Sequence, residues 1–288
     1  MMAGMDTWFT VLMSQNPFIM KKLLIALIAA AAVIPARAEL QTLIDREWAG
    51  TFAGFESRSL RFQFLADGSA VVHPLFKDKQ VYPYVRIPIR IELEESLADG
   101  STKLHPVLPE SLESSDKPTE KLKRSTVKGS FEGGATFEVT LAVKSGAVLF
   151  SGKLIDAGTF KDGRARLRIA AEILNFYGKD EKKLKNDPVA LAELVAKSSL
   201  TYMANDRKRT ELDFSESLGS GTVAGVREAS VELAVVGPKT FEFEASGASS
   251  MRMEPRIGGP LHRGFFVIWI PDADSKAGGE ASFSIAVK

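Results

Sequence analysis

The chain has 288 residues, with 37 basic and 36 acidic side chains, no cysteine, and hydrophobic residues at 45% of its positions. A net charge of +1 lacks the clustered basic excess on which nucleic-acid binding depends, so nucleic acid is not an expected partner. Without cysteine the chain can form no disulfide, iron–sulfur cluster, thiol nucleophile or cysteine-based zinc site, and its composition is that of a globular protein.

The first feature along the chain is a three-part pattern typical of a secretory signal peptide. A basic start at Met20 is followed by an apolar run, Leu23–Ile34, and by small residues that fit cleavage after Ala38. The alternative is an N-terminal anchor, but the apolar run is shorter than the ~20 residues that span a bilayer. We expect residues 1–19 to be a non-native extension from an upstream start, and residues 20–38 to be the signal peptide.

No second hydrophobic segment of membrane length follows this pattern. We therefore expect a periplasmic or extracellular protein that is not integral to the membrane. A folded chain of this length can bury a core without disulfides, so the lack of cysteine is compatible with an oxidising compartment.

Residues 39–97 are predicted to form a first β region. Phe62 and Phe64 alternate with polar residues, and the Asp67-Gly68 pair that follows is typical of a hairpin turn. Strands of this kind present alternate side chains to opposite faces of a sheet.

A longer alternation runs from Val81 to Leu93 and predicts a strand with one buried face. Pro83 and Pro88 both fall within this strand, and a proline has no backbone N–H to donate to a neighbouring strand. One proline is at an odd position and the other at an even one, so the missing N–H groups would face opposite sides of the strand. We expect the strand to be broken or bulged between the two prolines, or to lie at an edge for much of its length.

The segment 98–128 holds three prolines and shows little periodicity, which indicates a linker or a long loop. Residues 129–288 then alternate again and are predicted to form a second β region. Within it, Asp187 can cap a helix and Pro188 suits the first helical position, so one short helix is expected at 187–199.

This pattern of short strands predicts a mainly β fold, an antiparallel β-sandwich of immunoglobulin-like or similar type, as one core or two. The alternative is a lipocalin-like β-barrel. The pattern from Trp48 through Gly50 and Phe52 to Phe64, Asp67 and Gly68 resembles the opening strands of lipocalin-like barrels. The resemblance implies a barrel with an apolar interior that carries a small ligand, with 98–128 as a lid.

One set of candidate binding residues lies on the polar face of the predicted 81–93 strand: Tyr82, Tyr84, Arg86 and Arg90. Tyrosine and arginine are favoured contact residues in interfaces. The alternative is cross-strand packing, with nearby carboxylates neutralising the arginines.

A second candidate set is Arg164, Arg166 and Arg168, which share one face of a predicted strand. Three like charges in a row repel one another unless an anion binds them or carboxylates lie opposite. Candidate carboxylates lie on other alternating strands: Glu138, Glu232, Glu242 and Glu244. We expect pairing rather than anion binding.

Metal sites have little support in the sequence. The three histidines, His73, His105 and His262, are not at the spacing of zinc ligands, so no metal cofactor is expected. A weak calcium candidate is the carboxylate loop with Asp272, Asp274 and Glu280, for which a solvated hairpin loop is the ordinary alternative.

No catalytic constellation is recognisable, and no cofactor is implied. The leading hypothesis is an exported, non-catalytic β-sandwich protein that binds a protein or glycan partner in the bacterial cell envelope or has a structural role there. A ligand-binding barrel is the first alternative, and a hydrolase based on two carboxylates is the second. The sequence does not predict an oligomeric state.

The signal-peptide hypothesis predicts the N-terminus of the exported protein. Sequencing the first residues of the product recovered outside the cytoplasm is expected to give Glu39 as residue one. A mature N-terminus upstream of Met20 would contradict both the cleavage and the expected start.

Overall fold

The computed structural model describes residues 40–82, 84–160, 164–174, 176–178, 184, 186–213, 221–247, 249–257, 263–271 and 281–288. The predicted extension, 1–19, and the predicted signal peptide, 20–38, lie outside the described residues. His262 and the calcium candidate formed by Asp272, Asp274 and Glu280 also lie outside them.

The chain is mainly β, as expected. Its strands are β1 (Thr51–Glu56), β2 (Leu60–Leu65), β3 (Ala70–Pro74), β4 (Ile87–Ser96), β5 (Thr102–Pro106), β6 (Arg124–Ser130), β7 (Thr136–Lys144), β8 (Ala147–Asp156), β9 (Ala165–Leu174), β10 (Ser199–Ala204), β11 (Arg209–Asp213), β12 (Val223–Glu232), β13 (Thr240–Ser246), β14 (Ser250–Arg256), β15 (Gly264–Ile270) and β16 (Ser282–Val287). Short 3-10 turns are η1 (Lys77–Lys79), η2 (Pro109–Ser111), η3 (Glu132–Gly134) and η4 (Ala234–Val236).

The predicted short helix is confirmed as α4 (Pro188–Val195). The Asp187 carboxylate accepts a hydrogen bond of 3.0 Å from the Ala190 amide, which caps the first turn. The helix buries Leu191 and Val195 against Phe176, in a cluster separate from the main core. Among the described residues, no helix is long and apolar enough to cross a membrane.

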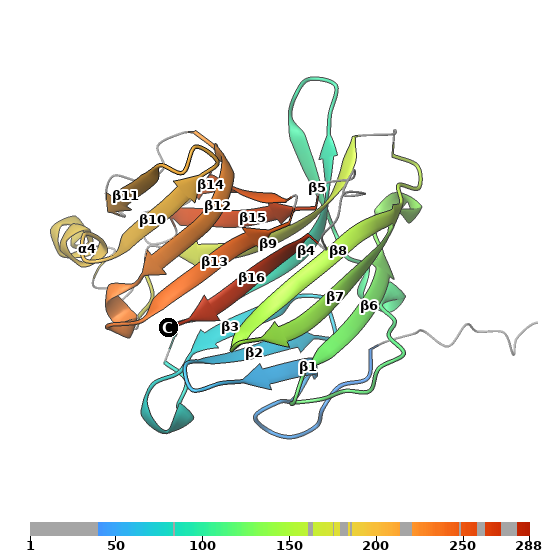
Figure 1. Cartoon of the computed structure of the whole chain (residues 1–288), viewed down its shortest axis with the longest axis horizontal. Helices are drawn as coiled ribbons and strands as arrows, with labels where there is room; N and C mark the ends of the chain where they lie inside the picture. The colour runs from blue at the N-terminus through green and yellow to red at the C-terminus, as the bar shows by residue number, and fades with distance from the viewer. Residues whose placement is uncertain are drawn as a thin grey trace, which may run out of the picture. The chain divides into compact units, whose positions relative to one another are not determined.

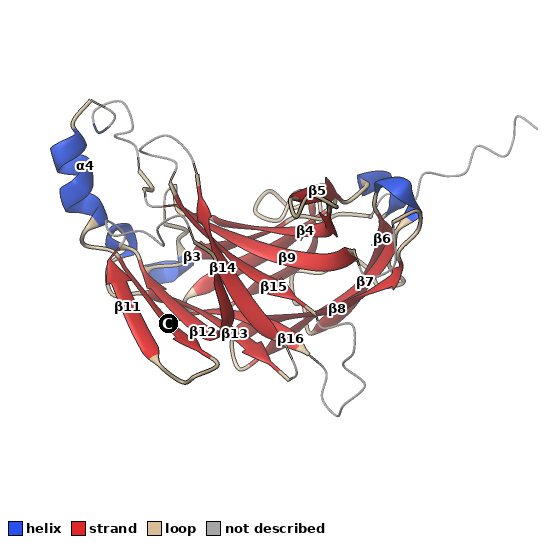
Figure 2. Ribbon diagram, turned by 90° about the horizontal axis from the view of Figure 1, so that it is seen from above, coloured by secondary structure: helices blue, strands red, loops and turns tan. Residues whose placement is uncertain are grey.

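In the described part of the chain, sixteen strands form one antiparallel sheet rather than two separate ones (Figure 1). The strand order is β1-β2-β3-β4-β9-β15-β14-β12-β13-β16-β8-β7-β6, with β5 paired to β4, β10 to β12, and β11 to β10. Figure 2 shows the strands curling round into a nearly closed, barrel-like sheet. This arrangement matches the barrel alternative more closely than a two-sheet sandwich.

The segment expected to be a linker, 98–128, instead joins the two ends of the sheet. It contains β5 and the first residues of β6. On β1, the Gly54 amide donates to the Thr119 carbonyl at 2.7 Å, and the Thr119 amide donates to Phe52 at 2.9 Å. On β6, Glu113 and Lys128 exchange two backbone hydrogen bonds of 3.0 and 2.9 Å. This segment therefore covers both edge strands, which would otherwise expose unpaired backbone groups.

The inner face of the sheet is filled by aromatic side chains. The Phe283 ring on β16 stacks with Trp269 and Phe243, with centroids 6.4 and 6.1 Å away, and lies 6.2 Å from Phe150. Phe150 in turn meets Phe62 edge-on at 5.8 Å. These rings join strands that are distant in sequence into one core. A packed interior of this kind argues against a ligand carried inside the barrel.

The prediction for the proline-containing strand is confirmed at its break. β4 begins at Ile87, between Pro83 and Pro88, and Pro83 itself lies outside the described residues. The strand is not an edge, because β3, β5 and β9 all pair with it. Its alternate residues Ile87, Ile89, Ile91 and Leu93 are buried, as expected.

Replacing Phe283 with alanine should be costly, because the ring contacts aromatic residues from three other strands. We expect Phe283→Ala to lower the free energy of unfolding by about 3–5 kcal/mol, measured by urea denaturation. The control, Val189→Ala on the exposed side of α4, should change it by less than about 0.5 kcal/mol. Equal losses from the two variants would contradict a shared aromatic core.

Candidate functional site

A large hollow lies on the outer side of the sheet, over β3, β4 and β9, and has a volume of about 1060 Å³. We call it the Tyr84 groove. Its lining residues include Asp67, Ser69, His73, Tyr82, Tyr84, Arg86, Pro88, Arg90, Glu92, Pro106, Glu172, Phe176 and Tyr177. A second hollow of about 300 Å³ lies next to it and shares Arg90, Glu92 and Glu172 in its lining.

The groove forms where β4 changes its neighbour. Along one side, β4 pairs with β3 at Ile87–Ile89 and then with β5 at Glu92–Ser96. The opposite side pairs with β9 throughout Ile89–Glu95. β3 therefore pairs only with the first residues of β4, and β5 only with the last ones. Neither strand pairs with β4 at Arg90, which leaves a gap in the sheet at that position. The β4–β5 hairpin projects beyond the ends of the neighbouring strands (Figure 1).

The floor beneath the second hollow is a network of buried and half-buried ion pairs centred on Arg168. The Arg168 side chain is 4% exposed and lies 3.0 Å from the Glu92 carboxylate, 3.9 Å from Glu94 and 3.8 Å from Glu254. Arg252 pairs with Glu94 and, at 2.8 Å, with Glu254. The Arg168 guanidinium also lies over the Phe266 ring, 5.8 Å from its centroid.

A second part of the floor lies under the groove itself. The buried Glu172 carboxylate accepts from Arg90 at 3.1 Å and also pairs with Arg256. The floor thus combines four arginines with four glutamates and is neutral overall: Arg90, Arg168, Arg252, Arg256, Glu92, Glu94, Glu172 and Glu254. Paired charges can be buried at a tolerable cost, whereas an unpaired one cannot.

Burial perturbs the titratable groups of the groove. It raises the pKa of Glu92, while the positive charges of Arg168 and Arg90 lower that pKa in part. Burial, followed by the charges of Arg61 and Arg86, lowers the pKa of His73 against the raising effect of a backbone hydrogen bond, so that histidine is neutral at pH 7. Burial also raises the pKa of Tyr177, whose hydroxyl accepts from the Leu174 amide at 2.9 Å.

The first sequence-predicted set comes together in the groove, although not on one strand face as expected. Tyr82 and Tyr84 precede β4, and Tyr84 lies in a turn with φ of +67°. Tyr84 is 55% exposed, whereas the Tyr82 ring packs edge-on against Phe76 at 4.9 Å. The shared strand face expected for these four residues is absent, because β4 begins only at Ile87, in agreement with the break predicted between Pro83 and Pro88. All four residues nevertheless line the same hollow.

The three arginines of the second sequence-predicted set, Arg164, Arg166 and Arg168, lie in different environments. Arg168 is buried and paired with carboxylates, whereas Arg164 and Arg166 are exposed. Pairing rather than anion binding is therefore found for Arg168, but its partners are not those expected from the sequence. Among the expected carboxylates, Glu138 pairs with Lys128 and Glu242 with Lys288. Arg168 has different partners from those expected because its strand, β9, lies between β4 and β15 in the sheet.

Sequence reasoning missed most of the ion-pair floor. Glu92 was expected to neutralise arginines, and the missed residues are Glu94, Glu172, Arg252, Glu254 and Arg256. A signal was present at Glu172, a single carboxylate within the apolar run of β9, and at Arg252, which stands between two buried methionines. A charge inside an otherwise apolar strand needs a partner, and this requirement could have identified both.

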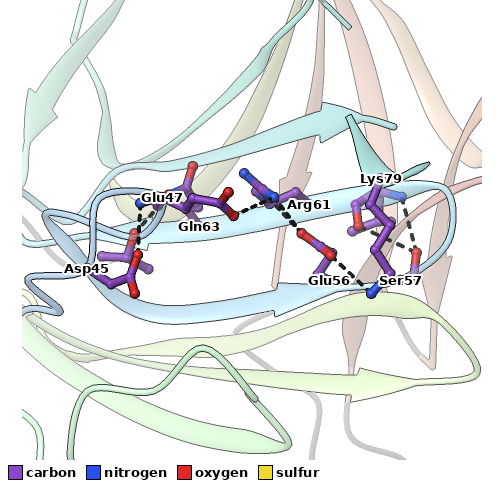
Figure 3. Close-up of polar contacts among 9 residues, drawn as sticks. Asp45, Glu47, Glu56, Ser57, Arg61, Gln63 and Lys79 are labelled. Atoms are coloured by element: carbon purple, nitrogen blue, oxygen red, sulfur yellow. Dashed lines mark hydrogen bonds and ion pairs between the residues drawn. The ribbon is translucent and has the colours of Figure 1, made fainter. Parts of the chain in front are cut away.

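Another polar cluster, on the β1–β2 hairpin, is structural in character (Figure 3). Arg61 lies between Glu47 and Glu56, at 3.2 and 2.7 Å, and its guanidinium stacks over Trp48 with 5.3 Å to the ring centroid. Lys79 reaches Glu56 at 3.2 Å. These charges neutralise one another on the surface, and no hollow is associated with Arg61 among the described cavities.

The described residues offer no metal centre. No group of three or more histidine and carboxylate side chains among them is placed to hold an ion. His105 bonds to Glu95 at 2.9 Å and meets the Phe160 ring edge-on at 4.9 Å, and His73 lines the groove.

No family model and no curated protein matches the chain. Among solved structures, the chain is similar to the crystal structure of the Slr1438 protein from Synechocystis sp. PCC 6803. The two share 11% sequence identity, with 87% of this chain and 97% of that chain covered, at a TM-score of 0.45. Similarity at this level carries no argument about function.

Removing Arg168 should leave the half-buried Glu92 carboxylate without its ion-pair partner. It should also take one of the two arginines from Glu94 and Glu254. We expect Arg168→Met to lower the free energy of unfolding by about 3–5 kcal/mol in urea denaturation at pH 7. The matched control, Arg166→Met, changes an exposed arginine of the same strand and should cost less than about 0.5 kcal/mol. Similar losses from the two substitutions would show that Arg168 is not the centre of the network.

Proposed function

We propose that this protein is an exported, non-catalytic binding protein of the bacterial cell envelope, which holds its protein or glycan partner in the Tyr84 groove. One observation carries the proposal: Tyr82, Tyr84, Arg86 and Arg90 line a single large hollow on the outer face of the sheet. Export is supported by the signal-peptide pattern of residues 20–38.

The mechanism would be surface complementarity. Tyrosine and arginine dominate the energetics of many interfaces because each offers a large contact area together with a hydrogen-bonding group. Tyr84 presents its ring from a turn with positive φ, a backbone conformation that costs energy in a residue other than glycine. Such strain is often retained where a side chain must be presented in one direction.

A hydrolase based on two carboxylates is supported less well. Glu92 and Glu172 both line the groove, and the raised pKa of Glu92 would suit a general acid. However, Arg168 lies 3.0 Å from Glu92, and its positive charge opposes the rise of the Glu92 pKa. The Glu172 carboxylate is already paired with Arg90 at 3.1 Å. In the strand register, Glu92 pairs with Arg168, and Glu172 lies four residues further along β9. Glu92 and Glu172 are therefore about 13 Å apart along the strand direction.

The proposal predicts that the purified protein is retained on an envelope fraction of the source cells through Arg86. We expect Arg86→Ala to weaken retention at least about tenfold in a sedimentation assay, equivalent to the loss of one good interface contact. Arg166→Ala, which removes an exposed arginine that does not line the groove, serves as the matched control and should bind as the unmodified protein does.

Equal retention of the two variants would place any binding surface outside the groove. A protein that is not retained at all, or that remains in the cytoplasm of the source cells, would contradict the proposed function as a whole.

A further inference from the structure

The charges that line the Tyr84 groove and the adjoining hollow are balanced. Together the two linings contain four arginines and five acidic residues, and Arg256, paired with Glu172, supplies the compensating charge. A simple anion would meet the carboxylates of Glu92 and Glu172, and a cation would meet Arg86 and Arg90. Neither sign of ligand charge is therefore favoured.

The groove nevertheless offers hydrogen-bonding groups of both kinds. Guanidinium groups such as those of Arg86 and Arg90 only donate, whereas the carboxylates of Glu92 and Glu172 only accept. A hydroxyl group can donate and accept, so a ligand with many hydroxyls can bond to both types of group without bringing charge. Apolar ligands do not fit, because they would bury these charges without replacing their water.

Aromatic residues also line the two hollows, and among them the Tyr84 ring, which is 55% exposed, offers the most surface to a ligand. Tyr82, Tyr84, Phe176 and Tyr177 line the groove, and Phe266 lines the second hollow. The groove, at about 1060 Å³, is slightly larger than the roughly 300–1,000 Å³ typical of small-molecule pockets, and the second hollow lies next to it. Its size suits an extended chain of several units.

A peptide strand is not favoured as the occupant. Peptides that bind to sheets usually add to a free edge through their backbone. The floor of the groove is the face of β4 and β9, and these two strands pair with each other over Ile89–Glu95. The neighbouring side of β4 is occupied by β3 and β5, which leaves only the short gap beside Arg90.

We infer that the Tyr84 groove binds an uncharged, hydroxyl-rich glycan chain of the cell envelope, with the exposed Tyr84 ring against a sugar face and the arginines and glutamates of the lining bonding to sugar hydroxyls. This inference rests on the proposed function and specifies the partner class of the same groove.

The experiment compares retention of the purified full-length protein on three preparations of the source-cell envelope: untreated, digested with proteinase, and oxidised with periodate, which cleaves vicinal diols. A glycan partner predicts retention that survives proteinase and falls at least about tenfold after periodate. It also predicts little change when the ionic strength is raised from about 0.05 to about 0.5 M, because no net charge is matched.

The same assay with two variants tests the role of the ring. Tyr84→Ala should weaken retention at least about tenfold, whereas Tyr84→Phe, which keeps the ring, should weaken it less. Circular dichroism of each variant establishes that it is folded, and Arg166→Ala again serves as the control outside the groove.

The outcomes separate the two proposals. Retention that is lost after proteinase but survives periodate, or that disappears at high salt, overturns the glycan inference and leaves the envelope-binding function standing. Absence of retention on the untreated envelope overturns the proposed function itself. Equal retention of Tyr84→Ala and the unmodified protein overturns the assignment of the glycan to this groove.

Discussion

The buried guanidinium of Arg168 is the constraint on which the outer face of the sheet depends. It lies within ion-pairing distance of carboxylates from two other strands, Glu92 and Glu94 on β4 and Glu254 on β14. Ion pairing offsets the free-energy cost of desolvating these charged groups. The strands must therefore keep the order and register that bring the partners together. The order of the strands thus determines which charged side chains meet on the outer face of the sheet.

The groove follows from the same arrangement. β4 must pair with β9 for Arg168 to meet Glu92, and on its other side β4 passes from β3 to β5. The hollow beside the gap between β3 and β5 is lined by Arg90, Glu92 and Glu172, which belong to the ion-paired floor. Because that floor is already neutral, the groove has hydrogen-bonding capacity without a net charge, whereas the inner face of the sheet is filled by aromatic rings.

The sequence predicted local features well and long-range ones poorly. The alternation through Phe62 and Phe64 and the Asp187 helix cap are short-range signals, and both elements are present. The closing role of residues 98–128 was missed because its contacts, such as that between Thr119 and Phe52, are made by backbone atoms and leave no trace in the residue types. The grouping of Tyr84 with Arg90 was predictable from their nearness in sequence, but the carboxylate partners of Arg168 depend on strand order, which no local pattern encodes.

The central claim is that ligands of this protein occupy the outer groove rather than the barrel interior or another face. The most direct measurement is a titration of the isotope-labelled protein with solubilised envelope glycan, followed by the chemical shifts of its backbone amides in NMR spectra. The account predicts that the shifted resonances cluster at Tyr84, Arg86, Arg90 and the neighbouring residues of β3 and β9. Shifts confined to other surfaces, such as the β10–β11 pair, or to the aromatic core around Phe283 would contradict it.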